Sequence, residues 1–201
     1  WPCYEQNLQH TGYTNSVVPY PFEPEWATTL VDENVSEQTF LIPGAPVSNG
    51  SVAVTGVQRS NDTVSTFQDL DVWGINVADG SIAWNVNVKG GVIGAPQIVE
   101  DYVIFAVWNY RLSGDDPRNT TLYALNVNDG KEAWSKTFND RRGCAPAVSG
   151  GKVVMCFLDK TGDAPDNFAA AYDLSSGAEL WKTPLNAEED HAAWGIGYSN
   201  A

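Results

Sequence analysis

Three segments of this chain repeat one residue pattern, and this repetition constrains the fold more than any other feature. They are residues 74–84, 124–134 and 171–181, and each reads as a strand, a glycine turn and a second strand that ends in tryptophan. The closing residues Trp84, Trp134 and Trp181 are 50 and 47 residues apart. A fixed period of this length is typical of a repeat architecture and not of one irregular core. The chain is therefore predicted to be a series of similar units.

A second hairpin precedes each of these segments. It opens on an Ala-Pro pair at residues 45–46, 95–96 and 145–146, and a short turn then leads into a run rich in β-branched and aromatic residues. Such runs favour strands. The frequent glycines and prolines, 18 and 11 in 201 residues, fit short strands joined by many turns. One unit is thus predicted to hold four short antiparallel strands.

A sheet of four strands cannot bury both of its faces alone, and no helical periodicity supplies a covering layer. Copies of the sheet must therefore pack on one another, as the blades of a β-propeller do. An immunoglobulin-like pair of sheets does not predict the same dipeptides every 50 residues. We predict an all-β chain, a partial β-propeller of about three complete four-stranded antiparallel blades with one strand at each end. The blades are predicted at residues 44–88, 93–138 and 144–185.

The two ends of the chain are predicted to be incomplete blades. Residues 1–43 form an N-terminal segment in which residues 24–30 resemble only the outermost strand of a unit. Residues 192–201 resemble the innermost strand of a fourth blade. Open sheet edges are normally covered in stable proteins. We therefore interpret the chain as the N-terminal part of a larger propeller, in which the remaining blades are its partners and residues 24–30 close the ring.

The repeated residues resemble the pyrroloquinoline quinone (PQQ) dehydrogenase-like propeller superfamily. Its blades carry a tryptophan-docking motif of the form A-x-D-x-x-T-G-K-x-x-W, which residues 171–181 follow most closely. The turn glycines, Gly80, Gly130 and Gly177, provide the positive φ of a tight turn. The three tryptophans are expected to bury their rings between adjacent blades. We interpret all six residues as structural.

The resemblance implies a fold and leaves the function open. Some members are alcohol dehydrogenases that hold PQQ with a calcium ion and use a carboxylate as base, whereas others bind no cofactor and act as scaffolds. No segment here matches the cofactor-binding or catalytic segments of the dehydrogenases. We therefore expect no catalytic residue, no cofactor and no metal site. The alternative is an N-terminal fragment of a PQQ- and calcium-dependent alcohol dehydrogenase.

The long connections of the predicted blades all fall on one face, which is therefore the expected binding face. Arg141 and Arg142, placed in the connection at residues 139–142, could hold a carboxylate or a phosphate, or pair with loop acids. A second candidate enters blade four and could bind a cation or act in acid–base chemistry, or be a solvated acidic loop. It comprises Glu188, Glu189, Asp190, His191 and Trp194.

The chain has three cysteines. Cys144 and Cys156 flank a turn at residues 149–152, so a hairpin centred there places them opposite or one position apart. A disulfide between them is conceivable, and two small buried hydrophobic side chains are the alternative. Cys3 has no evident partner.

The net charge of −14 argues against nucleic acid and anionic membranes as partners. No run of 18 apolar residues is present, so we expect no membrane span. Four Asn-x-Ser/Thr sequons fit an extracellular, cell-surface or periplasmic protein. The function expected from the sequence is a binding or scaffold module whose long-loop face meets a protein or glycan partner.

Overall fold

The computed structural model describes residues 23–30, 39–43, 45–61, 67–108, 119–159 and 167–185. Within these ranges all regular structure is β-strand, in three separate antiparallel sheets. The described ranges contain no helix that could cross a membrane. The all-β prediction is confirmed.

Each sheet corresponds to one copy of the sequence repeat and is called a blade below. Blade 1 comprises β1 (Thr39–Pro43), β2 (Val47–Ser48), β3 (Val52–Asn61), β4 (Phe67–Asn76) and β5 (Ile82–Lys89). Blade 2 comprises β6 (Gly91–Val99), β7 (Tyr102–Trp108), β8 (Thr120–Asn126) and β9 (Glu132–Phe138). Blade 3 comprises β10 (Arg141–Gly143), β11 (Ala147–Ser149), β12 (Lys152–Asp159), β13 (Phe168–Asp173) and β14 (Glu179–Pro184).

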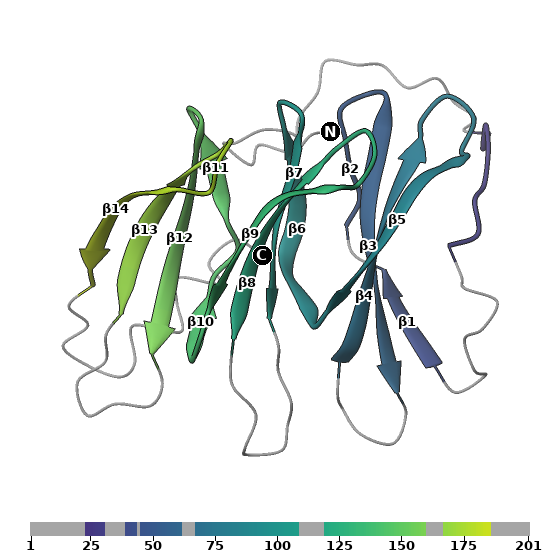
Figure 1. Cartoon of the computed structure of the whole chain (residues 1–201). Helices are drawn as coiled ribbons and strands as arrows, with labels where there is room; N and C mark the ends of the chain where they lie inside the picture. The colour runs from purple at the N-terminus through teal and green to yellow at the C-terminus, as the bar shows by residue number, and fades with distance from the viewer. Residues whose placement is uncertain are drawn as a thin grey trace.

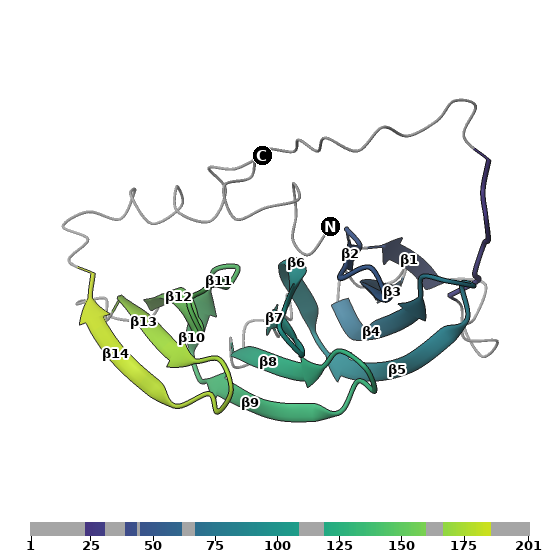
Figure 2. The same cartoon turned by 90° about the horizontal axis from the view of Figure 1, so that it is seen from above.

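The strands of each blade lie side by side in chain order (Figure 1). Seen from above, the blades stand next to one another along an arc, with β5, β9 and β14 on its convex side (Figure 2). The first strands of the blades lie toward the concave side. This radial repetition of four-stranded sheets is the arrangement of a β-propeller. The partial β-propeller predicted from the repeat is confirmed for the three blades, and the fourth blade predicted to begin at residues 192–201 lies outside the described residues.

The innermost strand of each blade is interrupted at its Ala-Pro pair. In blades 1 and 3 the interruption splits the strand into β1 and β2, or β10 and β11, which pair with the same neighbouring strand. In blade 2 the pairing register shifts between Ile93 and Gln97. Proline has no backbone N–H to donate to a sheet. Strand pairing therefore occurs on both sides of the Ala-Pro pair. In blade 3 the part before the pair is β10, which contains Arg141 and Arg142, so the prediction that these arginines lie in a connection is wrong.

The turn between the third and fourth strands is the same in the three blades. Gly80, Gly130 and Gly177 have φ angles of 72°, 69° and 67°, in the left-handed region that favours glycine. Each glycine N–H donates to the carbonyl four residues earlier, at Asn76, Asn126 or Asp173, at 2.8–2.9 Å. The Asp173 carboxylate also accepts hydrogen bonds from Ser175 and Ser176, which lower its pKa. The turn thus satisfies its own polar groups.

A tryptophan from one blade lies on the turn of the next blade. Trp84 is buried between blades 1 and 2, and its indole N–H donates to the carbonyl of Val127 at 2.8 Å. A Cβ on Gly130 would lie 2.6 Å from the Trp84 ring, so the ring fits against the turn only because no side chain is there. Around this contact, residues of both blades form one hydrophobic core, which includes Val72, Phe105 and Val127.

The same contact recurs between blades 2 and 3. Trp134 donates to the carbonyl of Leu174 at 2.8 Å and packs on Gly177. The core at this interface contains Leu122, Phe157 and Tyr172, among others. Each blade therefore buries one face against its neighbour.

Residues 23–30 repeat this contact on the outer face of blade 1 although they form no strand within the described structure. Trp26 donates to the carbonyl of Val77 at 2.8 Å and packs on Gly80, and Thr28 donates to the Gly80 carbonyl. The third tryptophan of the repeat differs: Trp181 is 42% exposed, whereas Trp84 and Trp134 are 7% and 9% exposed. All of β14 is exposed. The described residues thus leave the outer face of blade 3 uncovered.

Candidate functional site

The strand that carries the arginines, β10, runs across the junction of blades 2 and 3. It pairs with β12, so that Arg142 lies opposite Leu158 and Gly143 opposite Phe157, and it contacts β7 and β8 of blade 2. It lies at the ends of β7 and β8 away from the glycine turns, where Trp108 and Thr120 form a pair. We call this surface, defined by Trp108, Thr120, Arg141 and Arg142, the arginine end of the junction.

Thr120 attaches β10 to blade 2. Its side chain is fully buried; Oγ1 donates to the carbonyl of Arg141 and accepts a hydrogen bond from the N–H of Gly143, both at 2.9 Å. A Cβ on Gly143 would lie 2.8 Å from Thr120 Cγ2, so a larger residue could not approach so closely. One threonine therefore fixes the backbone on both sides of Arg142.

Replacing Thr120 by valine is expected to lower the free energy of unfolding by about 1–3 kcal/mol, because it leaves a partly buried N–H and a partly buried C=O without this partner. Urea denaturation measures the change. Thr121→Val is the matched control, since the Thr121 hydroxyl pairs with Thr137 at 3.0 Å on the exposed surface. The control is expected to change stability by less than about 0.5 kcal/mol. An equal decrease in the free energy of unfolding in Thr120→Val and Thr121→Val would contradict the role given to Thr120.

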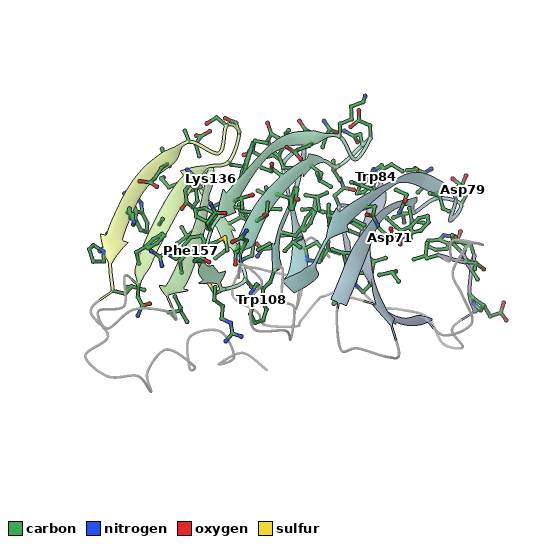
Figure 3. The ribbon with its side chains drawn as sticks, turned by 60° about the horizontal axis from the view of Figure 1, so that its bottom comes forward. Asp71, Asp79, Trp84, Trp108, Lys136 and Phe157 are labelled. Atoms are coloured by element: carbon green, nitrogen blue, oxygen red, sulfur yellow. The ribbon has the colours of Figure 1, made fainter. Side chains whose placement is uncertain are left out.

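The Arg142 guanidinium stacks on the Trp108 ring, with 4.1 Å from its central carbon to the ring centroid. Both side chains are half-buried. Figure 3 shows Trp108 at one end of the sheets and Asp79 in a turn at the other. A planar guanidinium on an indole face gains a cation–π interaction and has a fixed orientation. Such a group is suited to bidentate contact with a carboxylate or phosphate.

The second cluster predicted from the sequence lies outside the described residues. It comprises Glu188, Glu189, Asp190, His191 and Trp194. Among the described residues, no three His, Cys, Asp or Glu side chains are placed to hold a metal ion.

A buried tyrosine lies at the same junction. Tyr172 is fully buried, and its hydroxyl has no hydrogen-bond partner among the described residues. Lys136 of blade 2 lies over the ring, with Nζ 4.6 Å from the centroid. Burial raises the pKa of this tyrosine well above its usual value, and the nearby Glu179 carboxylate raises it further. The phenol therefore remains protonated at neutral pH and acts as a core side chain.

Cys144 and Cys156 are adjacent free thiols in the structure. The N–H of Cys144 donates to the carbonyl of Cys156 at 3.0 Å, and the N–H of Cys156 donates to Cys144 Sγ at 3.1 Å. The two residues are thus opposite each other, one of the two placements that the sequence allowed. A bridge between them stays a prediction.

Two residues of the arginine end were not found from the sequence. Trp108 ends a strand and Thr120 begins the next one, with the long connection at residues 109–119 between them. Their role depends on contacts with β10, which is more than 20 residues further along the chain. The sequence does show a tryptophan and a threonine at the facing ends of two strands. That pattern does not indicate which strand of the next blade the two residues contact.

Comparison with known proteins identifies a family whose model matches most of the chain. The model of the family described as outer membrane protein assembly factor BamB matches residues 26–197. A comparison with curated protein sequences gave no match. The quinohemoprotein alcohol dehydrogenase from Comamonas testosteroni is 18% identical with a TM-score of 0.52, over 92% of this chain and 27% of its own. This likeness shows a shared fold.

Two further solved structures are less similar. Quinohemoprotein alcohol dehydrogenase ADHIIG from Pseudomonas putida HK5 is 20% identical with a TM-score of 0.44, over 69% of this chain and 20% of its own. BamB from Moraxella catarrhalis is 14% identical with a TM-score of 0.22, over 68% of this chain and 59% of its own. The chain thus spans only about a quarter or less of the two dehydrogenases.

Proposed function

The chain belongs to the PQQ-like repeat family described as outer membrane protein assembly factor BamB, and we propose that it is a non-catalytic binding or scaffold module. In this proposal a protein partner docks on the arginine end of the junction between blades 2 and 3. The family description refers to protein assembly and not to a reaction, which supports a protein partner over a glycan. It also supports an extracellular, cell-surface or periplasmic location.

The observation that carries the proposal is the Arg142–Trp108 stack on a strand held by Thr120. Arginine and tryptophan are enriched among the residues that contribute most to protein–protein affinity. Here they come from different blades, so their relative position depends on the packed junction. A pre-positioned pair loses little conformational entropy on binding.

The charge of the site defines the chemistry of the partner. Arg141 and Arg142 are adjacent basic residues in a chain of net charge −14. At physiological ionic strength the screening length is about 8 Å, so acidic residues beyond that distance act weakly on a group bound at this strand. Asp140 adjoins Arg141 in the chain and Asp159 is opposite Arg141 in the strand pairing, so Arg142 is the arginine on which the proposal depends. We therefore propose that the docking segment of the partner presents carboxylates to these guanidinium groups.

The test uses a fluorescently labelled octaglutamate peptide as the probe, titrated with the protein and followed by fluorescence anisotropy. We expect saturable binding that Arg142→Gln weakens by about tenfold or more, the usual cost of one lost charged contact. Arg142→Lys is expected to restore only part of the affinity, since lysine keeps the charge without the planar fork.

Lys152→Gln is the matched control for Arg142→Gln. It removes the same charge from an exposed residue at the glycine-turn end of blade 3. We expect it to change the affinity by less than about twofold, because it alters only the screened net charge. The proposal would be overturned if the peptide did not bind saturably, or if Arg142→Gln and Lys152→Gln lowered the affinity equally.

The alternative function is a fragment of a PQQ- and calcium-dependent alcohol dehydrogenase. The fold likeness to a quinohemoprotein alcohol dehydrogenase motivates it. This alternative predicts saturable uptake of PQQ in the presence of calcium and oxidation of an alcohol with a dye as electron acceptor. The binding-module proposal predicts neither.

A further inference from the structure

Cys144 and Cys156 lie opposite each other in blade 3, at the end of the pairing between β10 and β12. Cys144 directly follows β10, and Cys156 is within β12. Their backbones share the hydrogen bond from the Cys144 N–H to the Cys156 carbonyl. In place of the reciprocal backbone bond, the Cys156 N–H points at Cys144 Sγ. The sulfur of Cys144 is thus directed at its partner residue.

The backbone geometry suits a covalent bond between the two sulfurs. Directly opposite residues in an antiparallel pair have Cα atoms about 4.5–5.5 Å apart. Disulfides are found at Cα separations of about 4.4–6.8 Å. The opposed backbones are therefore compatible with a bridge at this position.

The contact between the two thiols favours reaction at Cys144. The hydrogen bond with the Cys156 thiol lowers the pKa of Cys144 to about 6 and raises that of Cys156. A thiolate is the form that attacks a disulfide. Both residues are partly buried, and Cys144 packs against the core between blades 2 and 3.

We propose that Cys144 and Cys156 are a reversible cross-strand disulfide site, oxidised by a small disulfide such as oxidised glutathione. The Cys144 thiolate attacks the donor, forms a mixed disulfide and releases one reduced thiol. Cys156 then loses its proton and attacks Cys144 Sγ, which releases the second thiol. One S–S bond of the donor is exchanged for one S–S bond of the protein, and the two thiol protons end on the two released molecules.

The bridge would tie the segment that follows Arg142 and Gly143 covalently to β12. In the reduced state this segment is held by backbone hydrogen bonds and by Thr120. The oxidised state would therefore restrict the strand that carries the arginines. This inference depends on the two cysteines alone and stands independently of the proposed partner.

The test is peptide mapping of the full chain after exposure to oxidised glutathione at pH about 7.5, chosen because it exceeds the lowered pKa of Cys144. After acid quenching and alkylation, trypsin cuts behind Arg142, Lys152 and Lys160, so the two cysteines fall on separate peptides, 143–152 and 153–160. We expect these peptides to be recovered joined, with the mass of their sum less two hydrogen atoms, and to separate on reduction.

Three variants make the outcome specific. Cys3→Ser is expected to leave the joined peptides unchanged, whereas Cys144→Ser and Cys156→Ser are expected to abolish them. Oxidation of the wild-type chain is also expected to raise the thermal midpoint by about 6–12 °C, as a loop of this size in a chain of this length predicts. Separately alkylated peptides, a stable glutathione adduct on the wild-type chain, or linkage of either peptide to Cys3 would overturn the proposal.

Discussion

Replacing Trp134 by alanine is expected to lower the free energy of unfolding by about 3–5 kcal/mol, the usual cost of deleting a buried tryptophan. The ring is 9% exposed at the junction of blades 2 and 3, packs on Gly177 and donates to the carbonyl of Leu174. The substitution leaves a cavity between two blades and removes a hydrogen bond. Chemical denaturation of the 201-residue chain measures the loss.

Trp181→Ala is the matched control, because it changes the same position of the repeat in blade 3. Trp181 is 42% exposed, and no described residue covers the outer face of β14. We expect the control to cost less than about 1 kcal/mol, as for a surface substitution. A loss equal to that of Trp134→Ala would show that packing against the next blade does not distinguish the two tryptophans, and would contradict this account.

Replacing Gly130 by alanine is expected to destabilise the chain by about 3 kcal/mol. Alanine in the left-handed region costs about 1–2 kcal/mol, and Gly130 has a φ of 69°. The new Cβ would also lie 2.6 Å from the Trp84 ring, which must move out of its buried position. Steric overlap in a packed core typically adds about 1–3 kcal/mol.

Gly150→Ala separates the backbone cost of Gly130→Ala from the cost of its steric overlap with Trp84. Gly150 has a φ of 56° but nothing within 4 Å of a Cβ, so only the cost of the backbone conformation, about 1–2 kcal/mol, is expected. In a double-mutant cycle, Gly130→Ala is expected to cost less when Trp84 is already alanine, because the ring it meets is gone. Additive losses in the cycle would contradict the contact between the two residues.

The fold was largely predictable because its determinants are local and repeated. The pattern of glycine turn and tryptophan indicates two strands of each blade, and the period indicates that the blades pack on one another. The first strand of each blade was predicted to be shorter than it is. Each Ala-Pro pair interrupts the sequence pattern of a strand, whereas pairing with the neighbouring strand continues on both sides of the pair. Arg141 and Arg142 were therefore assigned to a connection and lie in β10.

The candidate site was less predictable because it is built between blades. The Arg142–Trp108 stack and the hydrogen bonds of Thr120 join residues that are distant in the sequence. The repeat predicts the tryptophan contacts between blades, but Trp108, Thr120 and Arg142 are not part of the repeated pattern. The opposition of Cys144 and Cys156, by contrast, arises within one blade and follows from the turn between them.

The central claim, that this chain binds a partner and carries out no quinone chemistry, is tested most directly by equilibrium dialysis in parallel against octaglutamate and against PQQ with calcium. The account predicts saturable accumulation of the peptide, weakened by Arg142→Gln and not by Lys152→Gln, and equal PQQ concentrations on both sides of the membrane. Calcium-dependent, saturable accumulation of PQQ without peptide binding would contradict it.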